Sequence, residues 1–503
     1  MNNNIYNGPQ APYIPQPVTK VKEKPEYSKA EVVLSVFAFI AAFCAVRYIL
    51  FNAMGFITTG VFIAIITAAI IYMKKKGCEF SAFNKVLAAV LYVFSFVFSI
   101  TANNFIKDLD ALFIFGAAAY LIYSAAAGNK DIERYLPFAV CKAIFEYPFS
   151  HFGKQAAITQ DSLSKSKAGS NVKYIIIGLL LTVPLTAIVA SLLMSADDGL
   201  AEMLSDIFER IFSEEIWNII LQLCLAIPCS MYLFGMFYSN THRGGIQPLD
   251  EQGCIRKLFS IRFVSNLIMY TAVTPICILY VLFFFSQASY FLSAFSSELP
   301  DGFTYADYAR QGFFELFAVA VINLIVLCAV SLFSKKSGRE KPFALKLYSV
   351  VLSIFTLILI ATAMSKMVMY IDNYGLTELR VYTSWFMILL AFIFVLIIIK
   401  QFRFDMKFTK HLAVIFTLLF AVLCFSRPEA LIAKYNIEMY RAGHLDELDT
   451  DAILKMSDDG LLAAYNEEAV TKEEVNKHKK RLYQRKTYGR YNLSAVILDS
   501  KTE

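Results

Sequence analysis

The feature that most constrains this chain is a series of apolar stretches, each long enough to cross a bilayer. A spanning helix needs about 20 mostly apolar residues, because the hydrocarbon core is about 30 Å thick. About eleven such stretches are present; they lie near 32–51, 54–73, 84–102, 109–127, 174–194, 217–238, 263–285, 313–334, 347–368, 381–400 and 408–427. We therefore predict an all-α fold, a polytopic integral membrane helical bundle. The very short loop around Asn52 leaves open a re-entrant hairpin for the first two stretches.

The composition excludes an ordinary soluble protein. Hydrophobic residues make up 57% of the 503 residues and charged residues 17%, with 45 Phe and 28 Tyr. A soluble domain is about half apolar and about a quarter charged. Most of the chain is therefore expected to lie in a bilayer.

The loops between the stretches alternate between basic and acidic, which predicts an orientation. Lys and Arg in short loops stay cytoplasmic. With the N-terminus inside, the inside loops hold roughly 28 Lys and Arg and the outside loops roughly 6. The inside is marked by Lys74, Lys75, Lys76, Arg256, Lys257, Arg262, Lys335, Lys336, Arg339, Lys341, Lys400, Arg403 and Lys407. The outside is marked by Asp108, Asp110, Asp197, Asp198, Glu214, Glu215, Asp301 and Asp307. An odd number of spans then places the C-terminus outside.

The distribution of basic residues also indicates which partners the chain binds. The net charge is +6, but the basic residues lie at membrane edges, so we expect no nucleic-acid partner. A polybasic inner face attracts anionic lipid, so the expected partners are the lipid bilayer and anionic lipid at the inner face.

The chain is expected to divide by composition. Residues 1–30 are polar and Pro-rich, which predicts a disordered cytoplasmic tail without a cleavable signal peptide. The bundle follows over 31–427. Residues 428–503 are soluble in character and predict a helical tail outside the membrane, where a protein partner is also expected.

Motifs for metal or cofactor binding are absent from the sequence. The nine Cys form no CxxC pair, and none follows Cys424, so disulfides are not expected. The five His are scattered, and no HExxH, GxxxxGK[ST] or GxGxxG occurs. We therefore predict no metal site and no cofactor.

Segments outside the bilayer have distinct patterns. Residues 195–216 carry apolar residues at helical spacing, which predicts an amphipathic helix on the outer side. Ser195, Asp197 and Asp198 are expected to cap it rather than bind an ion. The longest inner loop, 128–173, has an aromatic first half expected to rest on the inner leaflet and a second half, DSLSKSKAGSNVK, of linker composition.

The tail after residue 428 predicts several short helices. IAKYNIEMYRAG predicts one that ends at Gly443, and DTDAILKM and SDDGLLAAYN predict two more, each opened by Asp or Ser. EEVNKHKKRLYQRK predicts another. The tail is therefore expected to be a small helical module.

Four blocks resemble a bacterial family of multi-spanning membrane proteins, the domain of unknown function 4173 family, and its relative numbered 4153. They are SADDGL (195–200), YARQGFFELFAVAVINL (308–324), KMVMYIDNYGLTELRVYTSWFMILL (366–390) and IAKYNIEMYRAGHLDELDTDAILKMSDDGL (432–461). The resemblance covers about the last three hundred residues. Ala452 stands where such tails often carry an aromatic residue, which bears on the packing of the tail. The family has no established activity, so the resemblance implies architecture, a bacterial cell membrane and no catalytic residue.

Ionisable residues in spans are candidates for function, because charge in hydrocarbon is costly. The candidate ligand-binding residues, all predicted at the outer ends of their helices, are Glu315, Lys366, Asp372, Glu378 and Arg380. One interpretation is that long side chains reach water and pair between helix ends, as Glu315 would with Lys366 or Arg380. The other is an outward-facing polar pocket. A catalytic dyad is the least favoured reading.

The motif YGLT also has a local explanation. Gly375 permits a turn with positive φ, and Thr377 can cap a helix that begins with Glu378. Glu378 in a first turn suits the helix dipole. A tight structured turn is therefore the alternative interpretation of residues 372–380.

These patterns favour a non-enzymatic membrane component that works as a sensor, scaffold or accessory subunit. A transporter with a polar site in the outer half of the bundle is the first alternative. A membrane-embedded transferase is the second, and Asp197 or Asp372 would then be its base. The sequence names no ligand, solute or partner.

Overall fold

The computed structural model describes residues 27–127, 135–165, 214–242, 249–286, 305–335, 342–403, 405–482 and 491–502, with short parts of 182–195. Within these residues the regular elements are helices, and ten are long and apolar enough to span a membrane. The predicted membrane helical bundle is therefore confirmed. The predicted span near 174–194 falls mostly outside the described residues.

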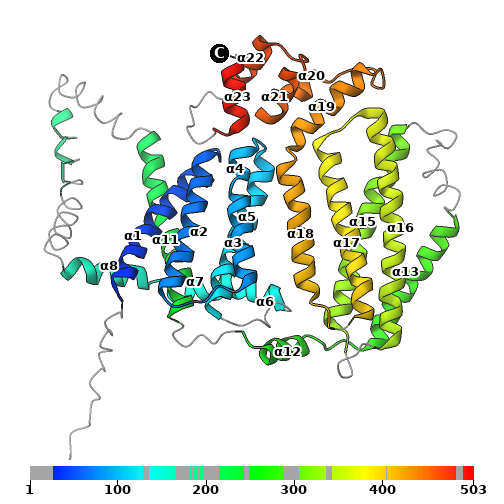
Figure 1. The fold of residues 1–503 in the computed structure, drawn as a ribbon, viewed down its shortest axis with the longest axis horizontal. Coiled ribbons are helices and arrows are strands. Elements are labelled where there is room, and N and C mark those ends of the chain that lie inside the picture. The colour runs from blue at the N-terminus through cyan, green and yellow to red at the C-terminus, as the bar shows by residue number, and fades with distance from the viewer. Residues whose placement is uncertain are drawn as a thin grey trace, which may run out of the picture.

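The long helices follow the predicted stretches closely (Figure 1). They are α1 (Lys29–Ala45), which continues as η1 (Val46–Leu50), α2 (Phe56–Lys75), α3 (Ala82–Ser95) with α4 (Val97–Ile100), α5 (Asn104–Ala127), α11 (Glu214–Thr241), α13 (Asn266–Ser286), α15 (Tyr305–Phe333), α16 (Phe343–Tyr374), α17 (Glu378–Phe402) and α18 (Phe408–Phe425). Since α1 with η1 and α2 are each long enough to cross, the re-entrant hairpin is not needed.

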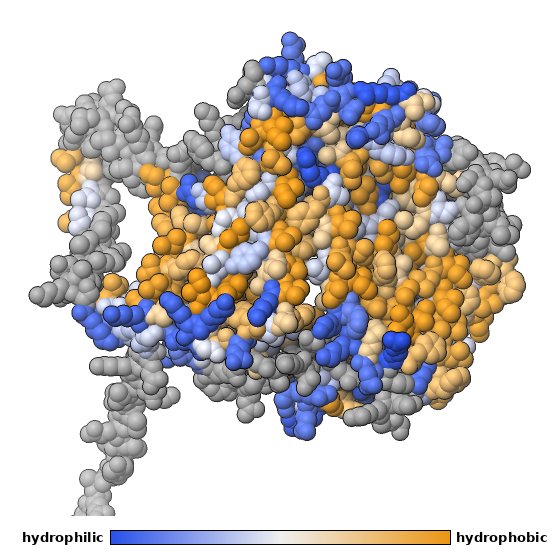
Figure 2. Space-filling model, in the orientation of Figure 1, coloured by the Kyte–Doolittle hydropathy of each residue, from blue (hydrophilic) through white to orange (hydrophobic). Residues whose placement is uncertain are grey.

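The surface of the bundle is apolar along its middle. Figure 2 shows a belt of apolar side chains between more hydrophilic ends. Leu282, Ile325 and Leu418 are more than half exposed on this belt. A continuous apolar belt over helices of membrane-spanning length is typical of a surface that contacts lipid.

The two ends of the bundle differ, and we name them by what they carry. The basic end holds the start of α1 and the end of α2, with Lys74 and Lys75 in the last turn of α2. The module end holds the start of α5 and the end of α18, and the C-terminal helices pack there (Figure 1).

The long helices form two packed groups. One core joins α1, α2, α5 and α11, and another joins α13, α15, α16 and α17. Helix α18 lies between the groups (Figure 1). Phe420 of α18 stacks on Phe94 of α3 with ring centroids 5.7 Å apart, and Trp385 of α17 donates to the Leu419 carbonyl at 2.8 Å. Aromatic contacts therefore connect the groups.

The basic end contains a buried acid. Glu31 is fully buried in the first turn of α1, where it completes a capping box with Ser28. It forms an ion pair with Lys76 and accepts a hydrogen bond from the Tyr72 hydroxyl at 3.1 Å. This contact joins the start of α1 to the end of α2.

The inner loop is largely helical. Its aromatic half forms α6 (Leu136–Cys141), η3 (Lys142–Glu146) and α7 (Tyr147–Ser150). Tyr147 is buried in the bundle, which the expectation of contact with the inner leaflet did not include, whereas Phe145 and Phe149 are exposed. A Cβ on Gly235 of α11 would clash with the Pro148 carbonyl oxygen, so this glycine permits the close packing. The part DSLSK is not a linker, because it ends the helix α8 (Lys154–Lys165).

Helix α8 lies at the basic end of the bundle, and the next described long helix, α11, starts at the module end. Gln155 of α8 donates to the Ser35 carbonyl of α1, which places α8 at the basic end. The end of α11 lies there too, since Thr241 hydrogen-bonds Tyr72, so α11 starts at the module end. The predicted amphipathic helix 195–216 falls between them, almost wholly outside the described residues. Residues 251–260, expected to be loop, form another short helix, α12 (Glu251–Ser260).

The C-terminal module contains the predicted short helices and one more. They are α19 (Pro428–Arg441), α20 (Thr450–Leu454), α21 (Asp458–Asn466), α22 (Lys472–Leu482) and α23 (Leu493–Thr502). Gly443 has φ of 75°, as expected after a helix, and Asp449 and Ser457 cap α20 and α21. The module has its own apolar core, centred on Ile432, Leu461 and Leu498.

Candidate functional site

The candidate site lies where the module meets the bundle. Helix α18 ends at Phe425 and α19 starts at Pro428, so Arg427 occupies the corner. Arg427 has φ of 51°, a left-handed conformation that costs a non-glycine residue about 1–2 kcal/mol. Such strain persists where surrounding contacts hold the residue in place.

The side chain of Arg427 supplies those contacts. Its Nη2 lies 2.9 Å from Oδ1 of Asp459 in α21, and its Nε donates to the same oxygen at 3.1 Å. Nη2 also donates to the Ser494 hydroxyl of α23. Arg427 therefore ties α21 and α23 to the end of the last spanning helix.

Asp459 connects this group to the first half of the bundle. It is fully buried, and its Oδ2 accepts hydrogen bonds from Thr101 Oγ1 at 2.5 Å and from the Ala102 backbone N–H at 2.8 Å. Its Oδ1 accepts from Ser494 as well as Arg427. A buried carboxylate is stable when donors surround it in this way.

Glu429 makes a second connection. It is 5% exposed and accepts hydrogen bonds from Asn103 Nδ2 at 2.5 Å and from the Ser457 backbone N–H at 2.7 Å, as well as from the Ser457 hydroxyl. Burial, together with the negative charge of Glu378, raises the pKa of Glu429 to about 7. Glu429 therefore links the start of α21 to the loop before α5.

We call these residues the module clamp: Thr101, Asn103, Arg427, Glu429, Ser457, Asp459 and Ser494. Another contact supports it, because the Phe56 backbone N–H donates to the Tyr491 carbonyl at 2.9 Å. The donors and acceptors of the clamp residues form hydrogen bonds with one another. The arrangement is suited to holding two parts of the molecule in register, and less to chemistry on a substrate.

Two further ionisable groups lie beside the clamp in α5. Lys107 is 2% exposed, donates to the Met54 carbonyl at 2.6 Å and feels the charges of Asp459 and Glu429. Asp110 is fully buried, and neither of its carboxylate oxygens has a hydrogen-bond partner. An unpaired buried carboxyl group is costly, so packing alone does not account for Asp110.

The predicted YGLT turn is confirmed. Gly375 has φ of 72°, and Thr377 caps α17. Asn436 of α19 brackets the turn: its Oδ1 accepts from the Leu376 N–H at 2.6 Å, and its Nδ2 donates to the Leu376 carbonyl at 2.9 Å. The two most specific blocks of the resemblance, YGLTELR and KYNIEMY, therefore contact each other.

The structure separates the five predicted ligand-binding residues into different settings. Glu315 is exposed on α15 and interacts electrostatically with the half-buried Lys366 of α16. Asp372 is exposed and accepts a hydrogen bond from Tyr435; burial and this charge raise the pKa of Tyr435. Glu378 acts electrostatically on Glu429 of the clamp. Arg380 donates to the Tyr374 carbonyl at 3.0 Å and lies 3.9 Å from the Tyr370 ring centroid.

The clamp is hard to predict from sequence for a physical reason. Lys107 and Asp110 lie next to the predicted span boundary, where Asp110 reads as part of an acidic loop. Asp459 was only part of a matching block, SDDGL. A usable signal was the short polar run TANN at 101–104 between two apolar helices, where a loop of buried polar residues requires partners from elsewhere.

Within the described parts of the chain, no group of three or more His, Cys, Asp or Glu is arranged to hold a metal ion.

In comparisons with known proteins, a family model with the description domain of unknown function (DUF4153) matches residues 87–467. No curated protein and no solved structure matches the chain.

Proposed function

Because the chain belongs to the family of the domain of unknown function 4153, whose description assigns no activity, we propose a function from its architecture. The protein acts as a non-enzymatic component of the bacterial cell envelope, as a sensor, scaffold or accessory subunit. The bundle anchors it, and the C-terminal module presents a surface to a partner protein. The module clamp carries this proposal, because the clamp holds the module to the first half of the bundle while Asn436 holds it to the turn before α17, so the module can transmit position between the halves.

The orientation is part of the proposal. Lys74, Lys75 and Lys76 lie at the basic end, and the positive-inside rule assigns that end to the cytoplasm. The module then lies outside the cell membrane. We also propose that the chain is related to the 4173 family, because the YGLTELR and KYNIEMY blocks occur in the order that this resemblance requires.

Cysteine labelling tests the orientation. In a cysteine-free background, Ser500→Cys places a thiol on the exposed face of α23 and Ser260→Cys places one on exposed α12. A membrane-impermeant maleimide on intact spheroplasts should label position 500 and miss position 260 until the membrane is permeabilised. The reverse pattern would reject the orientation.

Complementation separates the proposed role from a transporter. In a strain that lacks the gene and shows an envelope phenotype, Asp459→Asn should fail to restore the parent phenotype, because the module is released. Glu315→Gln with Lys366→Met should restore it. A transporter whose site is formed by Glu315, Lys366, Asp372, Glu378 and Arg380 predicts loss in the second variant. Immunoblots of membrane fractions must show equal amounts of each protein.

A further inference from the structure

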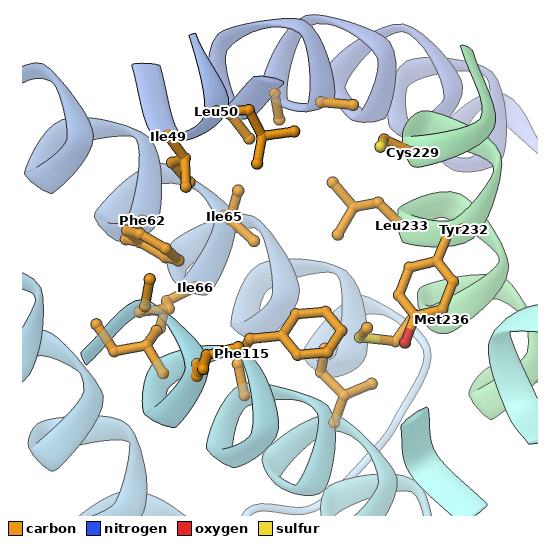
Figure 3. Close-up of a pocket in the computed structure, with 18 of the residues that line it drawn as sticks. Ile49, Leu50, Phe62, Ile65, Ile66, Phe115, Cys229, Tyr232, Leu233 and Met236 are labelled. Atoms are coloured by element: carbon orange, nitrogen blue, oxygen red, sulfur yellow. The ribbon is translucent and has the colours of Figure 1, made fainter. Parts of the chain in front are cut away.

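A large apolar cavity lies within the first half of the bundle, away from the module clamp. It has a volume of about 800 Å³ between α1, α2, α5 and α11. Figure 3 shows Phe62 and Ile66 of α2, Phe115 of α5, and Leu233 and Met236 of α11 around it. All four helices belong to the membrane-spanning set.

Small residues create this space. Ala41, Ala42 and Ala45 line it from α1, and Ala111 and Ala118 line it from α5. Larger side chains at these positions would extend into the cavity and fill it. Water cannot fill such a cavity well, because the lining offers too few polar partners. The chemistry of the walls therefore fits a hydrocarbon.

The size of the cavity also fits a lipid tail. On α5 its lining runs from Asp108 to Ile122, which at 1.5 Å per residue is about 21 Å along the helix. One leaflet of the hydrocarbon core is about 15 Å deep. A water molecule occupies about 30 Å³ in the liquid, and a methylene group is of similar size, so one or two acyl chains fit.

The two ends of the cavity carry different residues. At the module end Asp108 contributes a carboxylate to the lining. At the basic end Phe149 and Phe152 line it, and the intervening His151 feels the charge of the nearby Lys154. Burial and then that charge lower the pKa of His151, so Lys154 supplies the positive charge here. An anionic headgroup therefore finds a positive charge, Lys154, at the basic end.

We infer that this cavity binds the acyl chains of an anionic phospholipid whose phosphate lies at the basic end, near Lys154 and His151. The inference is independent of the proposed function, since none of the residues that line the cavity belongs to the module clamp. It adds a specific lipid site to the general attraction of a basic membrane face.

Photolabelling of the full-length protein tests the site. The protein is reconstituted in vesicles of phosphatidylglycerol and phosphatidylcholine that contain phosphatidylglycerol with a diazirine on its acyl chain. After illumination, adducts on peptides of α5 and α11 should exceed those on the α17 peptide around Phe392 several times. Phe392 is 45% exposed and serves as the reference for ordinary lipid contact.

Matched variants identify the cavity as the cause. Ala118→Trp and Ala45→Phe fill it from opposite sides and should each lower the α5 and α11 adducts to the α17 level. Ala64→Trp, on an exposed position of α2 that does not line the cavity, should leave them unchanged. Lys154→Gln should reduce the preference for labelled phosphatidylglycerol over labelled phosphatidylcholine.

Several outcomes would overturn the inference. One is labelling of α5 and α11 no stronger than that of α17, or labelling that persists in both filled variants. Stronger labelling by a diazirine polyprenyl phosphate would assign the site to an isoprenoid instead. A third outcome uses p-benzoylphenylalanine at position 115: a cross-link to residues of the same chain, with no lipid adduct, would show that the protein itself fills the cavity.

Discussion

Two polar clusters at the module end of the bundle differ in burial, and burial predicts their importance. In the module clamp, Asp459 is fully buried and surrounded by donors. In the pair predicted from sequence, Glu315 is exposed and Lys366 is half-buried. Breaking a buried pair costs about 3–5 kcal/mol, whereas an exposed pair contributes about 0–1 kcal/mol. Charge near a helix end is therefore a weak guide to which groups hold a membrane protein together.

The clamp also joins parts that are distant in the chain. Thr101 and Asp459 are separated by 358 positions, and the hydrogen bond between them connects the first half of the bundle to the module. Glu315 and Lys366 lie on α15 and α16, which already pack along their length. Losing the clamp should release a module, whereas losing the exposed pair should release nothing.

The largest expected effect comes from Asp459→Asn. It leaves Arg427 without its charged partner and weakens four contacts, so we expect a loss of about 3 kcal/mol in unfolding free energy. Thermal melts in detergent should show a clear drop in Tm, and proteases should cleave within the released module more readily. Asp451→Asn, at an exposed position of the same module, is the control and should melt like the parent.

The next effect concerns pH. The pKa of Glu429 is raised from 4.5 to about 7 in the folded protein, so the folded state holds this proton more tightly than the unfolded state. The resulting stability is fully present below about pH 4.5 and is lost as pH rises through about 7. The slope is at most about 1.4 kcal/mol per pH unit. Melting temperatures of Glu429→Gln should be flatter than those of the parent between pH 5 and 7; equal slopes would contradict this account.

A smaller effect is expected at the YGLT turn. Asn436→Ala removes two hydrogen bonds to Leu376 and should cost about 1 kcal/mol. Gly375→Ala should cost more, because φ is 72° and the new Cβ would lie 2.6 Å from Asn436 Oδ1. In the double variant that clash is gone, so chemical unfolding should give a total smaller than the sum. If the free-energy changes of the two single variants simply add in the double variant, Gly375 and Asn436 do not interact.

The smallest effect is expected for the predicted pair. Glu315→Gln and Lys366→Met should each change the unfolding free energy by less than about 1 kcal/mol, because the carboxylate is exposed. The double variant should show little coupling in a double-mutant cycle. A coupling as large as that of Arg427 with Asp459 would remove the distinction between the two clusters.

Features that depend on neighbouring residues alone could be predicted from the sequence. Membrane-length helices follow from apolar runs, and the turn at Gly375 and the caps at Thr377 and Ser457 follow from residue type. The sequence missed α23, because LSAVILDSKT is short and has mixed polarity. It also placed Tyr147 on a leaflet, since an aromatic loop pattern does not reveal that Gly235 opens a place for α7 in the bundle.

The candidate site was harder to predict, because its partners come from remote segments. Asp459 is an ordinary first-turn acid by local rules, and Thr101 is an ordinary loop residue. Their role exists only once the module lies on the bundle. The charges that are conspicuous in sequence, such as Glu315, are the ones that reach water, and for that reason they have less effect on the fold.

Hydrogen exchange in the parent and in Asp459→Asn tests the central claim most directly. The Ala102 amide donates to Asp459, so the peptide that covers residues 101–107 should exchange slowly in the parent. In the variant that peptide and the one covering 457–462 should both exchange faster, while peptides in the middle of α16 stay protected. Unchanged exchange at 101–107 would show that the module does not depend on the clamp, and it would contradict the account.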